Sequence, residues 1–378
     1  MAALYAVRML GLFMLLPVLA LYADGLHGAT LFLAGIAVGA YGLTQAALQI
    51  PFGILSDRFG RLPVILIGLA IFAGGSVVAA TSTSINGVIA GRALQGAGAI
   101  SAVLTALLAD NTRDGVRTRA MAVIGVTIGG SFMLSLIAGP TLTSLIGVPG
   151  LFWLTAGLAL AAMLLLLFGL PAAARIAQQR TELSLDGLRH AVRDRRLLTL
   201  DAGVFLLHLI LTATFTAVPF VLRDGLGIAA AAQWPIYLGV LIASLAGTVP
   251  LILWTERGAA KQAAFLTAVA GVGAAQLLLG SGPLWTTLGA LTLFFAGFNF
   301  LEARLPALLA EAAPAAWRGA ALGVYASAQY LGIFAGGAFG GWLLGRYGPA
   351  AVFTLCAAAS VLWVVTCGVG SRRPGADG

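Results

Sequence analysis

Charged side chains are scarce in this chain of 378 residues, of which Asp, Glu, Lys and Arg together make up 9%. That content excludes a soluble domain of ordinary composition, in which roughly 25% of residues are charged. Cysteine and histidine are also rare, with 2 and 3 residues, and the sequence has no Gly-Lys-Ser/Thr phosphate loop. We therefore expect no metal, no cofactor, no ATP-driven engine and no enzyme, because the clustered groups that an integral-membrane enzyme needs are missing.

Long polar stretches are nearly missing too, and 60% of the residues are hydrophobic. Apolar segments of about 20 residues, the length that crosses roughly 30 Å of hydrocarbon, follow one another along the whole chain. The twelve segments are 3–22, 31–54, 62–81, 86–109, 119–146, 150–170, 198–222, 234–254, 262–280, 284–310, 319–345 and 349–370. They predict an all-α integral membrane protein with twelve transmembrane helices in a lipid bilayer.

The net charge of +8 is unevenly distributed. If both termini are cytoplasmic, the cytoplasmic loops and tail hold 16 of the 21 Lys and Arg, while the outer loops hold only Arg223 and Arg346. This bias is the positive-inside pattern of membrane proteins. It predicts a multi-pass protein of a bacterial inner membrane and no nucleic-acid partner.

One long polar stretch divides the chain into two sets of six spans. The expected parts are an N-terminal six-helix bundle over 1–170, a cytoplasmic linker over 171–197, a C-terminal six-helix bundle over 198–370 and a cytoplasmic tail over 371–378. In the linker, Leu185, Leu188 and Val192 alternate with basic residues, which suits a short amphipathic helix on the inner surface. A flexible basic linker explains this stretch equally well.

The two halves resemble each other, because Asp110 and Glu311 each follow Leu-Leu-Ala at the end of a span. More faintly, Glu256 and Arg257 stand in the second half where Asp57 stands in the first. Two related halves about an axis normal to the membrane predict a cavity between them and a rocking motion of one half against the other.

The densest cluster of charge joins the second and third spans, in Gly53-Ile-Leu-Ser-Asp57-Arg58-Phe-Gly60-Arg61. Glycine lets two backbones approach closely, and Asp and Arg near a membrane are satisfied by each other, by water or by a helix end. These residues predict a latch between helices that move. A solvated surface loop is the alternative.

Segment 53–61 and the topology resemble the major facilitator superfamily. Segment 53–61 is similar to the motif between the second and third helices of that family. The chain departs from the motif at the next residue, Leu62, where a second basic residue is common. Segment 89–99 resembles the fourth-helix motif with its buried Arg92. Gly-Pro at 139–140 matches part of the fifth-helix motif of antiporters, but Thr-Ser at 143–144 replaces an expected glycine pair.

Four further segments, 8–19, 41–46, 91–96 and 323–329, are similar to one bacterial subgroup of the superfamily, and the resemblance covers essentially the whole chain. Members of that subgroup carry a small soluble domain after the last span. This chain ends at 371–378, so we expect that domain to be absent.

The resemblance implies the major facilitator fold, two pseudo-symmetric six-helix bundles that work by alternating access. It places Asp57 at the start of the eleventh helix, near Gly319, where a carboxylate caps helix N–H groups. It also implies that Arg61 meets Asp110 and that these contacts close the cytoplasmic face. The latch residues are then Gly53, Asp57, Arg58, Gly60, Arg61 and Asp110.

Glu302 lies inside the tenth span, where a charged carboxylate costs about 2.5–3.5 kcal/mol on insertion scales. That cost makes Glu302 a candidate proton carrier. The alternative is a structural ion pair with Arg304 or another basic group, although residues two apart on a helix point in different directions.

Four other ionisable residues are candidates for a role: three lie inside predicted spans, and the fourth lies at the end of one. His208 changes its charge near neutral pH and is a second proton candidate, with a packing role equally open. Arg92 needs an anion or carbonyl groups, and the resemblance supports a coupling or gating role. Arg8 either contacts substrate or extends its side chain to the inner interface. Asp201, near the inner end of the seventh span, is expected to be solvated.

Polar and amphipathic side chains also occur on spans 2, 8, 10 and 11. The candidate cavity-lining residues are Tyr41, Gln45, Gln49, Tyr237, Asn299, Tyr325 and Gln329. The first three recur every four residues and therefore share one helix face. Hydrogen bonding between helices is the alternative role.

These observations predict a secondary active transporter that moves a small-molecule substrate by alternating access and works as a monomer. Proton-coupled efflux, as in a drug/H+ antiporter, is the preferred mode. A nutrient symporter or uniporter for a sugar or an organic ion is the alternative, and an integral-membrane enzyme is a remote one.

Overall fold

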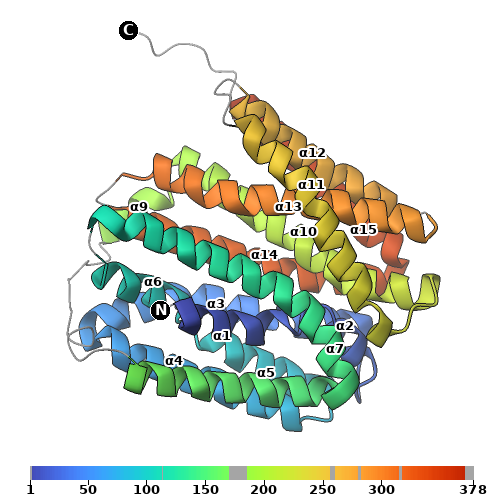
Figure 1. Ribbon diagram of the computed structural model, residues 1–378, viewed down its shortest axis with the longest axis horizontal. Coiled ribbons are helices and arrows are strands. Elements are labelled where there is room, and N and C mark those ends of the chain that lie inside the picture. Colours follow the sequence, from blue (N-terminus) through green and yellow to red (C-terminus); the bar gives the residue numbers. More distant parts are fainter. Residues whose placement is uncertain are drawn as a thin grey trace.

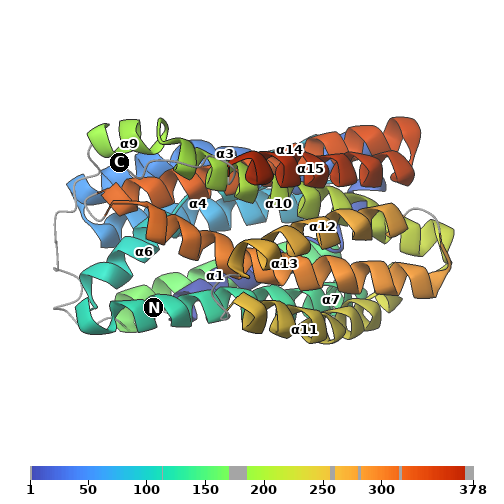
Figure 2. The ribbon, with the colours of Figure 1, turned by 90° about the horizontal axis from the view of Figure 1, so that it is seen from above.

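A computed structural model describes residues 2–112, 114–169, 185–255, 260–279, 282–314 and 317–370. Its long helices run along the longest axis of the molecule (Figures 1 and 2). One end, here called the linker end, holds the turn at Gly60, α6 and α9. The opposite end, here called the far end, holds α2 and η1.

Both halves are helical throughout the described residues. The N-terminal half contains α1 (Ala2–Phe13), α2 (Leu19–Asp24), α3 (Leu31–Phe59), α4 (Arg61–Thr81), α5 (Ile85–Ala97), α6 (Ser101–Asp110) and α7 (Asp114–Gly169). After the short α9 (Leu185–Ala191), the C-terminal half contains α10 (Arg195–Phe220), η1 (Val221–Gly225), η2 (Ala230–Ala232), α11 (Trp234–Thr255), α12 (Lys261–Leu279), α13 (Leu284–Ala312), α14 (Arg318–Tyr347) and α15 (Pro349–Gly370).

These elements make the twelve crossings that the sequence predicts. Nine described helical segments are long and apolar enough to span a membrane. One of them, Val126–Gly169, holds two crossings, because the chain turns at Gly147 with a φ of 68° that favours glycine. The broken pair α1 and α2 forms the first crossing, and α14 forms the eleventh.

Polar side chains begin several of these helices by capping free backbone N–H groups. Thr30 accepts a hydrogen bond from the N–H of Leu33 at the start of α3. Asp194 accepts from the N–H groups of Arg196 and Leu197 at the start of α10. The connections between spans are therefore fixed locally, at the ends of the apolar runs.

The linker contains the helix α9, whose His190 ring packs on Trp317 just before α14, with ring centroids 4.5 Å apart. This favours the helical interpretation over a wholly flexible linker for 185–191. Residues 171–184, the pair Glu256 and Arg257, and the tail 371–378 lie outside the described residues, so the predictions made for them are not addressed.

The halves meet most closely along α3 and α14. Gly39 of α3 lies so near α14 that an added Cβ would come 2.9 Å from the carbonyl oxygen of Phe334. Gly35 of α3 lies still closer to α14, because an added Cβ would come 2.7 Å from the Cα of Gly341 and nearer yet to the carbonyl oxygen of Gly337. Small residues allow this backbone contact between membrane helices. The two halves are therefore packed together at the far end.

An ion pair and an aromatic cluster also join the halves. Arg223 of η1 lies 3.9 Å from Asp24 of α2, between its Nη2 and the Oδ2 of the aspartate. Deeper in the molecule, the ring of Phe132 on α7 packs against Phe295 and Phe298 on α13, with centroids 6.4 and 6.0 Å apart. These contacts reinforce the closure of the far end.

Candidate functional site

Two polar clusters lie in the interior, one in each half. The first, here called the proton triad, consists of His208 on α10, Glu302 on α13 and Gln329 on α14. The second, here called the Arg8 cluster, is centred on Arg8 of α1 and is described below. Both are built from three helices or more, so each depends on the packing of the bundle.

Gln329 connects the other two members of the proton triad. Its side-chain nitrogen lies 2.8 Å from His208 Nε2 and 3.4 Å from Glu302 Oε1. The second carboxylate oxygen of Glu302 lies 3.6 Å from His208 Nε2. A small shift would bring this pair to direct hydrogen-bond distance.

The hydrogen bonds of His208 define its tautomer. Its Nδ1 lies 3.1 Å from the carbonyl oxygen of Val204, and a carbonyl can only accept, so Nδ1 carries the proton. Nε2 then accepts from the amide N–H of Gln329. A second proton on Nε2 would break that bond and would favour the Glu302 carboxylate as its partner. The hydrogen-bond partners available to Gln329 therefore depend on whether His208 Nε2 carries a proton.

The environments of Glu302 and His208 differ sharply. The Glu302 side chain is 37% exposed, whereas that of His208 is 6% exposed. Among the described contacts Arg304 does not pair with Glu302, since its Nη1 lies 3.5 Å from Glu311, two turns further along α13. The basic group beside Glu302 is His208, so a structural pairing stays open. The triad thus has an accessible member and a buried one.

The Arg8 cluster holds a buried guanidinium among neutral groups. Arg8 donates through Nη1 to Ser101 Oγ and through Nη2 to Gln45 Oε1 at 3.0 Å and the carbonyl of Gly98 at 3.5 Å. Gln45 in turn donates to Gln49 at 3.0 Å. Tyr41 lies on the same face of α3 but packs on Arg92, so the predicted polar face is divided between two neighbours.

A residue of the other half completes this cluster. The hydroxyl of Tyr330 on α14 lies 3.2 Å from Ser101 Oγ on α6. Tyr330 follows Gln329 directly, so consecutive residues of α14 contact the Arg8 cluster and the proton triad. Neither Ser101 nor Tyr330 is singled out by the sequence, because Ser and Tyr are unremarkable within membrane spans.

Arg92, for which the resemblance implies a coupling or gating role, lies apart from His208 and Glu302. It lies in the N-terminal half, where Nε and Nη2 donate to the carbonyls of Ala37 and Val38 at 3.3 Å and Nη1 donates to Gln95 at 2.8 Å. Its guanidinium also lies 4.5 Å from the ring centroid of Tyr41. These contacts tie α5 to α3.

The latch segment is assembled at the linker end. Arg61 Nε lies 3.1 Å from Asp110 Oδ2, as the resemblance implies, and Nη1 pairs with Asp57. Arg61 is buried and donates a further hydrogen bond to Ser56 Oγ at 2.5 Å. Ser56 itself donates to the carbonyl of Gly53 at 2.7 Å.

The other latch residues have simpler roles in the geometry. Gly60 has a φ of 94°, which favours glycine and lets α3 turn directly into α4. Arg58 is exposed and lies over the ring of Phe59. Among the described contacts none joins Asp57 to the start of α14, whose N-cap residue Trp317 makes no side-chain cap hydrogen bond. Asp57 is instead held by Arg61.

Three predicted cavity-lining residues belong to neither of the two polar clusters. Tyr237 is fully buried and donates to Gln233 at 3.2 Å. Asn299 donates to Ser244 on α11 at 3.2 Å. Tyr325 is buried on α14, within electrostatic reach of Glu302 and Asp201, and its hydroxyl has no hydrogen-bond partner among the described residues. Asn299 thus bonds between helices, whereas the hydrogen bond of Tyr237 is local to the start of α11.

The prediction that Asp201 is solvated is wrong. Asp201 is 6% exposed, and its Oδ1 has no hydrogen-bond partner among the described residues. The reason is its position on the face of α10 that is covered by neighbouring helices. It is a buried acid in the C-terminal half, unlike the partly exposed Glu302.

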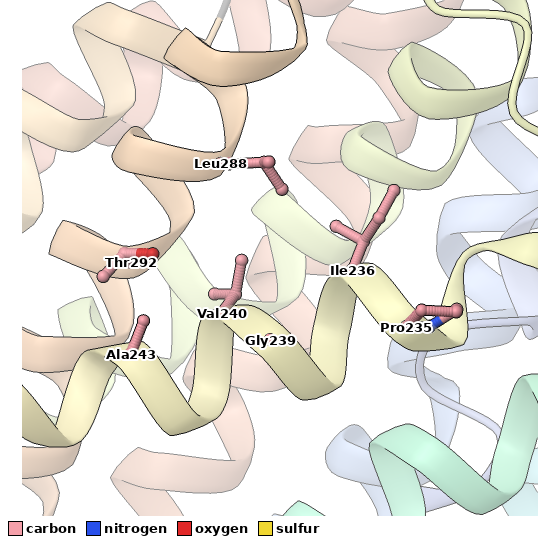
Figure 3. Close-up of a pocket in the computed structure, with 7 residues that line it drawn as sticks. All are labelled: Pro235, Ile236, Gly239, Val240, Ala243, Leu288 and Thr292. Atoms are coloured by element: carbon pink, nitrogen blue, oxygen red, sulfur yellow. The ribbon is translucent and has the colours of Figure 1, made fainter.

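A described cavity lies outside both polar clusters. It has a volume of about 350 Å3 and is lined by Pro235, Ile236, Gly239, Val240 and Ala243 of α11 and by Leu288 and Thr292 of α13 (Figure 3). Its lining is almost wholly apolar, so it offers no group for proton transfer or ion binding.

Known proteins resemble this chain over nearly its whole length. The family model of the Major Facilitator Superfamily matches residues 1–337. The inner membrane transport protein YajR of Escherichia coli (strain K12) is 40% identical over 377 residues, which cover 99% of this chain and 83% of YajR. An uncharacterized transporter of Buchnera aphidicola (strain APS) is 33% identical over 337 residues, 88% of this chain and 86% of that protein.

A solved structure shows the same fold. The xylose transporter XylE from E. coli, in a partially occluded inward-open conformation, matches with a TM-score of 0.76 at 14% identity. The match covers 100% of this chain and 97% of XylE.

Proposed function

This chain belongs to the Major Facilitator Superfamily, and from that premise we propose that it exports a small solute across a bacterial inner membrane in exchange for protons. It is a multi-pass membrane transporter by family and by fold. The finer proposal of proton coupling is carried by one observation, the contact of Glu302, Gln329 and His208 in a single triad.

The triad supports proton transfer between solvent and the interior. Glu302 is partly exposed and exchanges protons with water, whereas His208 is buried 3.6 Å away. A proton that reaches His208 Nε2 removes the acceptor of the Gln329 amide and creates a cation beside the Glu302 carboxylate. Charged and neutral forms therefore demand different positions of the Gln329 side chain.

The position of Gln329 supports coupling to movement of the halves. It lies on α14, which packs against α3 of the other half over most of its length. The neighbouring Tyr330 contacts Ser101 in the Arg8 cluster. A change in proton occupancy thus acts on the helix that joins the two halves, and solute binding at the Arg8 cluster acts on the same helix from the other side.

The latch supports a cytoplasmic linker end, as proposed from the distribution of basic residues, with both termini cytoplasmic. Arg61 holds Asp57 and Asp110 together within the N-terminal half. When the linker end closes, Asp57 is in position to cap the start of α14, where no side-chain cap forms in this conformation. The monomer contains both halves and therefore suffices for this cycle.

Symport or uniport of a nutrient is the second candidate, and the fifth span gives it specific support. Thr143 donates its hydroxyl to the carbonyl of Gly139 at 2.8 Å, and the helix continues where antiporters carry a glycine pair. The direction of coupling, not the presence of a proton site, separates the two candidates.

Transport by the purified protein in liposomes tests the proposal. Solutes that raise its unfolding temperature are loaded into vesicles with an imposed pH gradient, and their flux is followed. If the protein exchanges solute for protons, the solute should move in the direction opposite to proton flow, and its flux should stop when the gradient is collapsed. Solute flux in the same direction as proton flow would support symport. Flux that ignores the gradient contradicts proton coupling.

Two variants assign the coupling to the triad. Glu302→Gln keeps the shape of the side chain but cannot lose a proton, so we expect the pH dependence of transport to disappear. Glu311→Gln, an exposed acid on the same helix, is the matched control and should keep that dependence. Normal pH dependence in Glu302→Gln would remove Glu302 from the mechanism.

A further inference from the structure

Arg8 carries a buried charge that no acid balances among the described residues. Its side chain is 4% exposed, and its contacts are the neutral oxygens of Ser101, Gln45 and Gly98. Its Nε is buried and has no hydrogen-bond partner in the part of the chain that the structure describes. By contrast, the buried Arg61 is paired with two carboxylates.

Arg92 provides an internal comparison, since it is equally buried and also lacks a described acid partner. Each of its three nitrogens donates to an oxygen, two of which are backbone carbonyls, and an aromatic ring covers its face. That environment is one structural solution for a buried guanidinium, because all three nitrogens are bonded and an aromatic ring stacks on the face. Arg8 also makes three hydrogen bonds, but among the described contacts its Nε has no partner and no aromatic ring covers its face.

An uncompensated buried guanidinium is unfavourable, and a bound anion relieves the cost. Guanidinium presents a planar fork of donors that matches a carboxylate, a phosphonate or a sulfonate. Ser101 and Thr105 lie on the partly exposed face of α6, so the cluster has an open side. Tyr5, which contacts both of these residues, and Tyr330 supply further hydroxyl donors around it.

We propose that Arg8 binds the anionic group of the transported solute, so that the substrate class is an organic anion. This inference rests on the proposed transport function and specifies the ligand of its central site. Tyr330 gives the bound anion a contact from the other half, which links occupancy of the site to the packing of α14. Ser101 and Gln45 are neutral acceptors that the anion displaces from the guanidinium.

A first experiment needs no ligand and compares unfolding temperatures of the full chain in neutral detergent. Arg8→Gln removes the unbalanced charge, so we expect the ligand-free protein to keep or raise its unfolding temperature. Arg92→Gln is the matched control and should lower it, because satisfied carbonyls lose their donor. If Arg8→Gln lowers the unfolding temperature as much as Arg92→Gln does, Arg8 has a structural role and the proposal is overturned.

A second experiment uses probes that share one skeleton but differ in charge: benzoate, benzyl alcohol and benzylamine, with the 1-naphthyl set beside them. Anionic members should raise the unfolding temperature of the unmodified protein by roughly 2 °C or more at about ten times their Kd. The shift should vanish in Arg8→Gln and return in part in Arg8→Lys. No response to any anion, an equal response in Arg8→Gln, or a response only to anionic phospholipid would each overturn the proposal.

Protection from arginine-specific dicarbonyl reagents adds a readout that requires no variant. Mass spectrometry should show that an anionic probe slows the modification of Arg8 and leaves Arg92 unchanged. Because these measurements use no proton gradient, they separate this inference from the transport proposal. Anion binding without gradient-driven flux would refute only the coupling, and coupled flux of cations alone would refute only the assignment of Arg8.

Discussion

Replacement of Gly39 by valine should push the two halves apart at the far end. A Cβ at this position would lie 2.9 Å from the carbonyl oxygen and 3.0 Å from the Cα of Phe334 on α14. Both atoms belong to backbone, so no side chain can rotate away from the added methyl groups. The conflict is relieved only if α3 and α14 separate.

The size of the effect follows from the cost of overpacking, which is typically about 1–3 kcal/mol. Only conformations with a packed far end carry this cost. The ratio of far-end-open to far-end-closed molecules should therefore rise by about 5- to 150-fold. A change of this size is visible whenever the open state starts at a few per cent.

Electron–electron distance measurements between spin labels report this ratio. Labels are placed on the exposed positions His27 and Ala229, one in each half at the far end, after replacement of the free cysteines Cys356 and Cys367. Gly39→Val should add or enlarge a population at longer distance.

The control is Gly74→Val on α4, where an added Cβ meets nothing within 4 Å. This variant should leave the distances unchanged. An unaltered distribution in Gly39→Val, or an equal change in Gly74→Val, would refute the conclusion that α3 and α14 close the far end.

Three other changes have distinct expected results. Asp24→Asn removes the half-exposed ion pair with Arg223 and should favour far-end opening by less than about 1 kcal/mol. The effect should be smaller in high salt, and an effect independent of salt would argue against an electrostatic contact. Arg61→Gln leaves two clustered carboxylates without their cation and should destabilise the protein by about 3–5 kcal/mol, whereas the exposed Arg58→Gln should be nearly neutral in the same thermal unfolding assay. Asp201→Asn removes a buried carboxylate whose Oδ1 has no partner among the described residues, and it should raise the unfolding temperature. A lower unfolding temperature would show that the charge of Asp201 is compensated.

Much of the fold is predictable from the sequence because span length and apolar content set each crossing. The interruptions inside spans are harder to predict. The fourth crossing breaks at Gly98 between α5 and α6, and the first breaks between α1 and α2, although both read as continuous apolar runs. Such breaks depend on neighbouring helices that supply partners for freed backbone groups.

The candidate site is only partly predictable, for a related reason. Glu302 and His208 stand out by residue type, since ionisable groups are costly inside a membrane. Their meeting through Gln329 depends on how α10, α13 and α14 pack, which periodicity within one helix does not specify. Asp201 shows the same limit, because hydropathy alone does not reveal which face of α10 is covered.

The Arg8 cluster illustrates a second limit. Arg8, Gln45 and Gln49 are visible in the sequence as polar residues in apolar runs. Ser101 and Tyr330 complete the cluster from two other helices, and both residue types are ordinary in such spans. The turn at Gly60 follows from the local motif, whereas the Arg61–Asp110 contact joins residues 49 positions apart and is implied only by the family resemblance.

The central claim is that proton occupancy of the triad controls the arrangement of the two halves. The most direct test is the distance distribution between the labels at positions 27 and 229, measured at pH 6 and pH 8 in the unmodified background and in Glu302→Gln. We expect the distance distribution to change with pH in the unmodified background and in the control Glu311→Gln. In Glu302→Gln it should be the same at both pH values. A pH response that persists unaltered in Glu302→Gln would contradict the central claim.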